Sequence, residues 1–167
     1  VSLETGFSGL DQIFDLSSKQ IKKKLKENIP NKILLVGEAI RKKINLTKIH
    51  KLSKIDPWFL NQIKEIIDNE VKIKKNGLPK NFNEFNYIKS IGFSDKKLSE
   101  LTSTSETIIR RKREALKVLP VYKKVDTCAA EFKSFTPYMY STYQRSFSLS
   151  SECEADPSNR KKIIILG

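Results

Sequence analysis

The chain has 167 residues, of which 38% are hydrophobic and 31% charged, and its formal net charge is +13. This length fits one domain, or one small domain with tails, and suffices for one core. Because no apolar run approaches about 18 residues and no signal peptide is visible, the composition excludes a membrane-spanning protein and predicts a soluble, cytoplasmic one.

Apolar residues recur at helical spacing through the first two thirds of the chain, beginning with Ile21 and Leu25 among lysines. Asp56 followed by Pro57 is the clearest helix start, because Asp caps free amides and Pro at the first position loses no hydrogen bond. Gly77 predicts the end of that helix. The apolar stripe expected along it consists of Phe59, Ile63, Ile66, Ile67 and Val71.

Six further helices are predicted around this one. Ser94 is expected to cap the helix at 95–101, and Ser103 with Glu106 has the pattern of a capping box for the last helix. That last helix is expected to run through the apolar residues Ile108, Ile109 and Leu116. The complete set of predicted helices is 18–29, 32–44, 47–53, 56–74, 83–91, 95–101 and 103–119.

The helical period disappears after Pro120, where aromatic residues, Ser, Thr and scattered charges take over. We expect extended or irregular chain there, with short strands at 121–125 and 138–143 and a Ser-rich mobile loop at 146–151. The predicted fold is therefore all-α: a small multi-helix domain with an extended, largely irregular C-terminal arm.

Positive charge concentrates between residues 19 and 54, where twelve Lys and Arg accompany Glu27 and Glu38 and leave a local charge of +10. Such a patch attracts phosphates. However, Lys outnumbers Arg by 26 to 6, and nucleic-acid surfaces prefer the bidentate Arg. Compositional drift toward Lys is the simpler interpretation of this charge.

Residues 93–116 also have the pattern of a helix-turn-helix, with a basic run at 110–113 on the second helix. A plain helical hairpin with a solvated basic face explains the same pattern. A nucleic-acid-binding helical module is therefore kept as the alternative function.

Residues able to carry chemistry are few. Cys128 and Cys153 lack the spacing of a zinc site, and His50 is the one histidine of the chain. Cys128 lies near Asp126 but has no partner base in the sequence, and no phosphate-binding glycine motif occurs. We therefore expect no catalytic, cofactor-binding or metal-binding residue in this chain.

The thin apolar stripe made by Ile21 and Leu25 allows two interpretations. A stripe one residue wide per turn either covers the edge of a core or belongs to a contact between subunits. Both interpretations stay open on the sequence alone. We take Ile21 and Leu25 as the candidate subunit interface.

Several stretches have a distinctive order of residues: PVYKKVDTCAAEF at 120–132, YMYSTY at 138–143 and ECE at 152–154. Further ones are LETGFSGLD at 3–11, IDPWFL at 55–60, GFSD at 92–95 and KIIILG at 162–167. Together they resemble the central oligomerization domain of the large subunit of carbamoyl phosphate synthetase. The resemblance covers nearly the whole chain, although residues 15–54 match only in pattern.

The resemblance implies a non-catalytic, mostly α-helical domain that links two synthetase halves and helps subunits associate. It implies that residues 1–18 end the first half or form a linker, that 19–119 form the helical domain, that 120–160 form a connecting arm, and that 161–167 begin the first strand of the second half. A first residue Val1 without Met, and a last strand-like run at 163–166, agree with a piece excised from a longer protein.

For the parent protein, the resemblance implies synthesis of carbamoyl phosphate from bicarbonate, glutamine-derived ammonia and two ATP, in pyrimidine and arginine biosynthesis. ATP, Mg²⁺ (or Mn²⁺) and K⁺ are expected in the flanking halves and none of them in this chain. The expected partners are the flanking synthetase halves, a glutaminase small subunit and further copies of the same chain.

Overall fold

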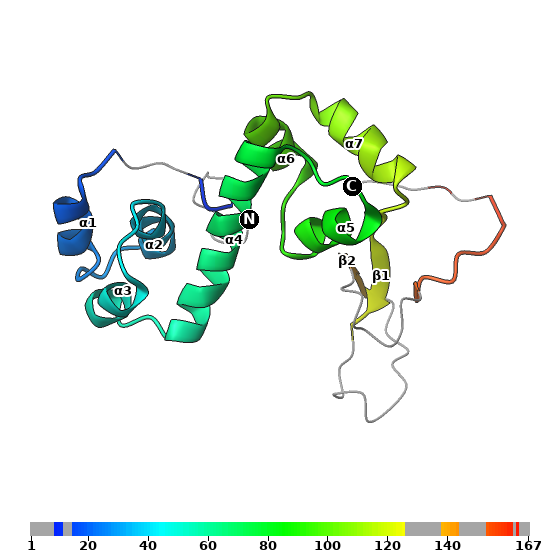
Figure 1. Ribbon diagram of the computed structural model, residues 1–167. Helices are drawn as coiled ribbons and strands as arrows, with labels where there is room; N and C mark the ends of the chain where they lie inside the picture. The colour runs from blue at the N-terminus through cyan, green and yellow to red at the C-terminus, as the bar shows by residue number, and fades with distance from the viewer. Residues whose placement is uncertain (1–8, 12–14, 126–137, 144–152, 162, 164–167) are drawn as a thin grey trace. The chain divides into compact units, whose positions relative to one another are not determined.

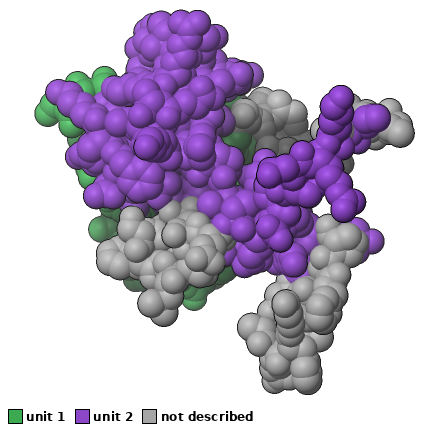
Figure 2. Space-filling model, turned by 90° about the vertical axis from the view of Figure 1, so that its right-hand side faces the viewer, with its two compact units in different colours: residues 1–77 green, residues 78–167 purple. Residues whose placement is uncertain are grey.

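A computed structural model describes residues 9–11, 15–125, 138–143, 153–161 and 163. These residues form seven helices and a small two-stranded sheet (Figure 1). The chain divides into two compact units, residues 1–77 and 78–167, which Figure 2 distinguishes in green and purple. The predicted class, a largely helical fold followed by an extended arm, is confirmed. The helices expected as one domain at 19–119 are distributed over both units.

The first unit contains four helices, and α2 lies in contact with the three others (Figure 1). Its buried core consists of aliphatic side chains from all four, joined by partly buried residues such as Leu10 and Ile55. Burial of these side chains is the main stabilising contribution to the unit. The helices are α1 (Ser18–Lys24), α2 (Lys32–Arg41), α3 (Leu46–Ser53) and α4 (Pro57–Asn76).

Side-chain caps fix the helix starts of the first unit. Ser17 and Gln20 form a capping box at α1, and Asn45 accepts a hydrogen bond from the Thr47 amide at α3. Asp56 caps α4 by accepting from the Trp58 amide at 2.8 Å, with Pro57 at the first helical position. This start of α4 is as predicted, and so is its end at Gly77, whose φ of 78° favours glycine.

The apolar stripe of α4 is rotated from the one expected. Ile63 and Ile67 are buried as predicted, together with Leu60 and Ile73. Phe59 and Val71 are more than half exposed, so the prediction that they face the core is wrong. The reason is that α2 and α3 pack on the side of α4 that carries Leu60, which leaves the adjacent position outside.

The second unit contains three helices and the sheet. Its buried apolar residues include Phe85, Leu98 and Ile109, one from each helix, and Val118 from the segment that follows them. The helices α6 and α7 pack against each other and are joined by the short turn at 103–105. The elements are α5 (Phe82–Ser90), α6 (Asp95–Thr102), α7 (Glu106–Ala115), β1 (Val121–Lys124) and β2 (Met139–Thr142).

Ser94 caps α6 as predicted, but the expected capping box of Ser103 with Glu106 is wrong. Ser103 instead ends α6 in the left-handed conformation with φ 52°, and its amide donates to the Ser99 carbonyl. Ser105 is the residue that caps α7. Two helices so close in sequence each need their own terminal residue, so the first of the serines serves the preceding helix.

The strands β1 and β2 pair antiparallel, with Val121 opposite Thr142 and Lys124 opposite Met139. The two strands predicted after Pro120 are therefore confirmed. The expected mobile loop at 146–151, Cys128 and most of the expected strand at 161–167 lie outside the described residues. Across the part of the chain that is described, no helix is long and apolar enough to cross a membrane.

Candidate functional site

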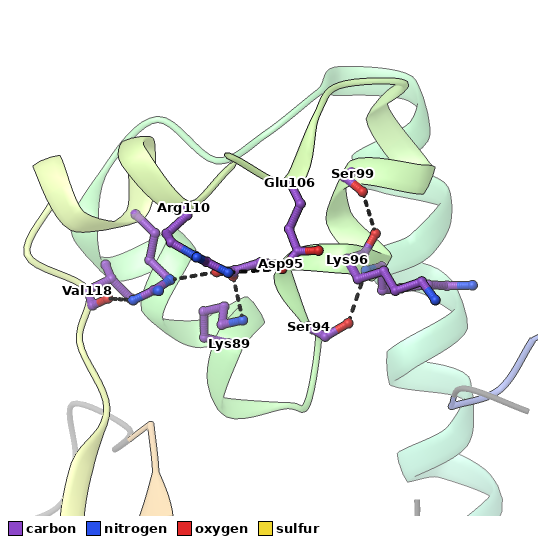
Figure 3. Close-up of polar contacts among 10 residues, drawn as sticks. Lys89, Ser94, Asp95, Lys96, Ser99, Glu106, Arg110 and Val118 are labelled. Carbon is purple, nitrogen blue, oxygen red and sulfur yellow. Dashed lines mark hydrogen bonds and ion pairs between the residues drawn. The ribbon is translucent and has the colours of Figure 1, made fainter. Parts of the chain in front are cut away.

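The polar centre of the second unit is the carboxylate of Asp95, at the start of α6. Lys89 of α5 donates to its Oδ1 at 2.8 Å, and Arg113 of α7 donates to its Oδ2 through Nε at 3.1 Å. Arg113 also donates to the carbonyl of Val118 at 2.9 Å (Figure 3). One carboxylate thus connects three helices, and the guanidinium carries the connection to the chain that leads into β1.

The environment of Asp95 favours its charged form. Burial raises the pKa of Asp95, but the hydrogen bonds and charges of Lys89 and Arg113 outweigh burial and hold the pKa below its ordinary value. Tyr143, directly after β2, lies over both cations, with its ring centroid 5.1 Å from the Lys89 ammonium and 6.0 Å from the Arg113 guanidinium. Burial raises the pKa of Tyr143. This contact joins the arm to the helices.

The first unit has a comparable centre at Arg41, the last residue of α2. Its Nε and Nη2 donate to one oxygen of Glu70 on α4, at 3.2 and 2.8 Å, and Nη2 also donates to the carbonyl of Leu10. Glu38, one turn earlier and almost fully buried, lies 3.9 Å from Arg41 Nη1. Arg41 therefore ties the segment at Leu10 to α2 and α4.

A third polar contact holds Glu154 beside strand β1 of the two-stranded sheet. The Glu154 carboxylate accepts from the Lys124 amide at 2.7 Å and from the Lys123 ammonium at 3.0 Å. The Glu154 amide in turn donates to the Tyr122 carbonyl at 2.8 Å. The Lys124 amide, and after it Lys123, lower the pKa of Glu154. All three centres are structural arrangements of paired charges.

Ile21 and Leu25, the candidate subunit interface, lie inside the core of the first unit. Both are 0% exposed and pack with residues of α2 and α4 in one apolar cluster. In this conformation their side chains cover their own core, which is one of the two interpretations left open. Their part in association between subunits stays a prediction, and the surface above them consists of the exposed residues of α1.

In the two helices considered as a helix-turn-helix, the basic residues at 110–113 do not form one exposed surface. Arg113 is buried and bound to Asp95 and Val118, and Arg110 pairs with Glu106 at 3.2 Å on its own helix. Nothing in the structure supports the nucleic-acid alternative. The pair α6 and α7 is a helical hairpin with one basic residue turned inward.

The residues considered for chemistry are not brought together. His50 binds the Ile55 carbonyl through Nδ1 at 2.8 Å, which fixes the chain between α3 and α4. Cys153 is an exposed free thiol, and Cys128 lies outside the described residues. Among the residues that the structure describes, no three His, Cys, Asp or Glu side chains are grouped as a metal site requires.

The cluster around Asp95 and the exposed aromatic pair of Trp58 and Phe59 were not predicted from the sequence. Asp95 follows the capping serine directly, which signals only an acidic first turn. Its partner Arg113 is 18 residues away, and nothing local distinguishes it from its basic neighbours. The sequence did not indicate that Trp58 is exposed, because a residue in the first turn of a predicted helix can face either the core or the solvent.

Comparison with known proteins gives a consistent family. Residues 1–117 match the family described as "Carbamoyl-phosphate synthetase large chain, oligomerisation domain". The chain is 42% identical over 172 residues to a carbamoyl phosphate synthase large chain of Rhizobium meliloti and 46% identical over 171 residues to one of Xanthomonas campestris. It is 42% identical over 171 residues to the arginine-specific chloroplastic large chain of Oryza sativa.

These matches cover 99% of this chain but only 14–15% of each relative, so the chain corresponds to a small part of those proteins. The matched residues include the whole of the first unit and residues 78–117 of the second. On this similarity, the chain belongs to the family of the oligomerisation domain of the carbamoyl-phosphate synthetase large chain.

Proposed function

We propose that this chain is the non-catalytic linking and self-association domain of a longer carbamoyl phosphate synthase large chain. The observation that carries this proposal is the match of residues 1–117 to an oligomerisation domain, together with relatives several times as long as the chain. The three polar centres agree with it, because each fixes one segment of backbone to another.

The longer protein would make carbamoyl phosphate from bicarbonate, glutamine-derived ammonia and two ATP, in the cytoplasm. Its ATP, Mg²⁺ (or Mn²⁺) and K⁺ would be held by synthetase halves on either side of this chain. A glutaminase small subunit would supply the ammonia. Within the chain, the boundaries proposed are a linker at 1–18, the helical domain at 19–119, the arm at 120–160 and a first strand at 161–167.

We place the self-association face on the exposed side of α1. Ile21 and Leu25 fix this helix on the core, and its exposed residues Lys22, Lys23 and Lys24 face away from that core. The buried pair would thus support an interface from beneath rather than touch the second copy. In this arrangement Ile21 and Leu25 position the interface helix while they remain buried in the core.

Sedimentation equilibrium of the 167-residue chain tests self-association directly. A weight-average mass that rises above 19.2 kDa with protein concentration is the expected result. A mass that stays at the monomer value over the whole accessible range would contradict the proposal. An assay of ATP hydrolysis by the same samples is expected to give no turnover above a protein-free blank.

A further inference from the structure

Trp58 and Phe59 expose two large aromatic rings side by side at the start of α4. Trp58 is 61% exposed and Phe59 is 56% exposed, and their ring centroids lie 4.9 Å apart with the rings nearly perpendicular. Trp58 is the only tryptophan of the chain. Two adjacent aromatic side chains that are each more than half exposed form an apolar surface patch, and aromatic residues concentrate binding energy in interfaces.

The position of this pair is fixed by the structure rather than left to a loop. Asp56 caps the helix immediately before it, Pro57 restricts the backbone, and Leu60 directly after it is 0% exposed in the core. The pair therefore projects from a rigid helix start. A contact made there loses little conformational entropy, which favours binding.

A second copy of the chain is an unsuitable occupant for this pair. Lys51 and Lys54 are exposed in the segment before it, which favours a partner with acidic groups, whereas Lys64 is paired with Asp68. An untethered second copy would need more than this pair, because two side chains supply far less than the roughly 800 Å² per partner that a stable interface buries.

A region of the same polypeptide does not face these limits. A tethered partner is held at high effective concentration, so a small apolar contact is enough to keep it in place. The chain spans only about 15% of the length of its relatives, so in a large chain of that size most of the polypeptide lies outside these 167 residues.

We propose that Trp58 and Phe59 form a docking contact for the rest of the same large chain, in an apolar pocket with acidic groups at its rim. The inference rests on the proposed function, because it requires a longer large chain. It adds to that function a second surface, distinct from α1, that holds the domain within its own polypeptide.

Hydroxyl-radical footprinting read by mass spectrometry tests this proposal. Oxidation rates of Trp58 and Phe59 are compared between the 167-residue chain and the full-length large chain, with buried Phe85 as the internal reference for a protected ring. We expect both residues to react readily in the short chain and to fall to the level of Phe85 in the full-length protein. Equal reactivity in the two proteins would overturn the proposal.

The same measurement on diluted samples distinguishes the two occupants. Protection by the rest of the polypeptide persists at concentrations where the full-length protein is monomeric by light scattering. Protection that disappears on dilution would show a second copy and would also overturn the proposal. Failure of self-association in sedimentation would leave this result unaffected, so the two proposals fail separately.

A substitution pair provides the matched control. Phe59→Ala is expected to raise the oxidation rate of Trp58 by a larger factor in the full-length large chain, where half of the docking contact is lost, than in the 167-residue chain, where only the Phe59 ring beside Trp58 is removed. Phe82→Ala removes a phenylalanine that is 45% exposed at the start of α5 and is expected to leave Trp58 protected. An unchanged rate at Trp58 in the Phe59→Ala variant would contradict the docking contact.

Discussion

Asp95 is the residue on which the second unit depends most clearly. Its carboxylate binds Lys89 and Arg113, and all three side chains are nearly buried. Without this carboxylate the two nearly buried cations would have no anionic partner there, which is unfavourable because buried charges require one. The Tyr143 ring covers the same cations, so the arm after β2 depends on the same carboxylate.

Asp95→Asn is therefore expected to destabilise the second unit by about 3 kcal/mol, because it leaves two partly desolvated cations without their anion. Chemical denaturation followed by circular dichroism measures this change. Asp68→Asn is the matched control, since Asp68 pairs with Lys64 on the exposed side of α4 and its loss should cost at most about 1 kcal/mol. Equal effects of the two substitutions would contradict the assigned role of Asp95.

The lowered pKa of Asp95 also predicts how stability depends on pH. Because the folded pKa lies below the unfolded value of about 3.9, the contribution of Asp95 is fully present above that value. It is lost as the pH falls through the lower folded pKa. The difference in unfolding free energy between the parent chain and Asp95→Asn is thus expected to shrink as the pH is lowered from about 6 to about 3. Denaturation series at several pH values measure it, and a constant difference would contradict the expectation.

At the scale of elements, local chemistry in the sequence was enough to place most helices, but not to orient them. Asp56 with Pro57 and Ser94 mark helix starts because capping involves neighbours only. The two short strands were predictable because the helical period stops at Pro120, but their pairing was not. The buried face of α4 was not, since Phe59 and Leu60 are equally apolar and only the packing of α2 and α3 decides between them.

The last helix shows the same limit. The pattern allowed helix to residue 119, whereas α7 ends at Ala115, and Lys117 takes a φ of 57°. The Val118 amide then donates to the Arg113 carbonyl, while Arg113 Nη1 donates to the Val118 carbonyl. This early end places Val118 in the core. The early end of α7 depends on the charge cluster of Lys89, Asp95 and Arg113. These residues come from three helices, so no local sequence pattern predicts it.

Burial of α1 on the core predicts the effect of truncating its apolar side. Leu25→Ala is expected to lower the unfolding free energy of the first unit by about 3 kcal/mol, through lost burial and an added cavity. Thermal or urea denaturation measures the loss. Val71→Ala, at a position 59% exposed on α4, is the control and should change stability by less than about 0.5 kcal/mol. A small effect at Leu25 would show that α1 is not fixed on the core.

This expectation changes how the interface should be probed. Leu25→Glu would place a charge at a position that is 0% exposed and would unfold the unit, so a loss of association in that variant would not identify an interface. Substitutions of the exposed lysines of α1 avoid this difficulty, because Lys22 and Lys23 are exposed and can change without disturbing the core.

For the molecule as a whole, charge is the property that most affects association. The net charge is +13, and residues 19–54 alone contribute +10, including the lysines of α1. Two copies that meet through α1 bring these charges together and repel each other. Salt weakens that repulsion, since the screening length falls to about 10 Å at 0.1 M. Self-association of this chain should therefore grow stronger as ionic strength rises.

We expect the association constant to rise several-fold between about 0.05 M and about 0.3 M NaCl, measured by sedimentation equilibrium. The double variant Lys22→Glu with Lys23→Glu should associate more strongly than the parent chain at low salt and should respond less to added salt, because the opposing charges at α1 are reduced. Lys96→Glu with Arg111→Glu alters the net charge by the same amount on exposed positions of the second unit. If α1 is the association face, this control keeps the salt response of the parent chain. Association that weakens with salt in the parent chain, or equal behaviour of the two double variants, would place the contact on another surface.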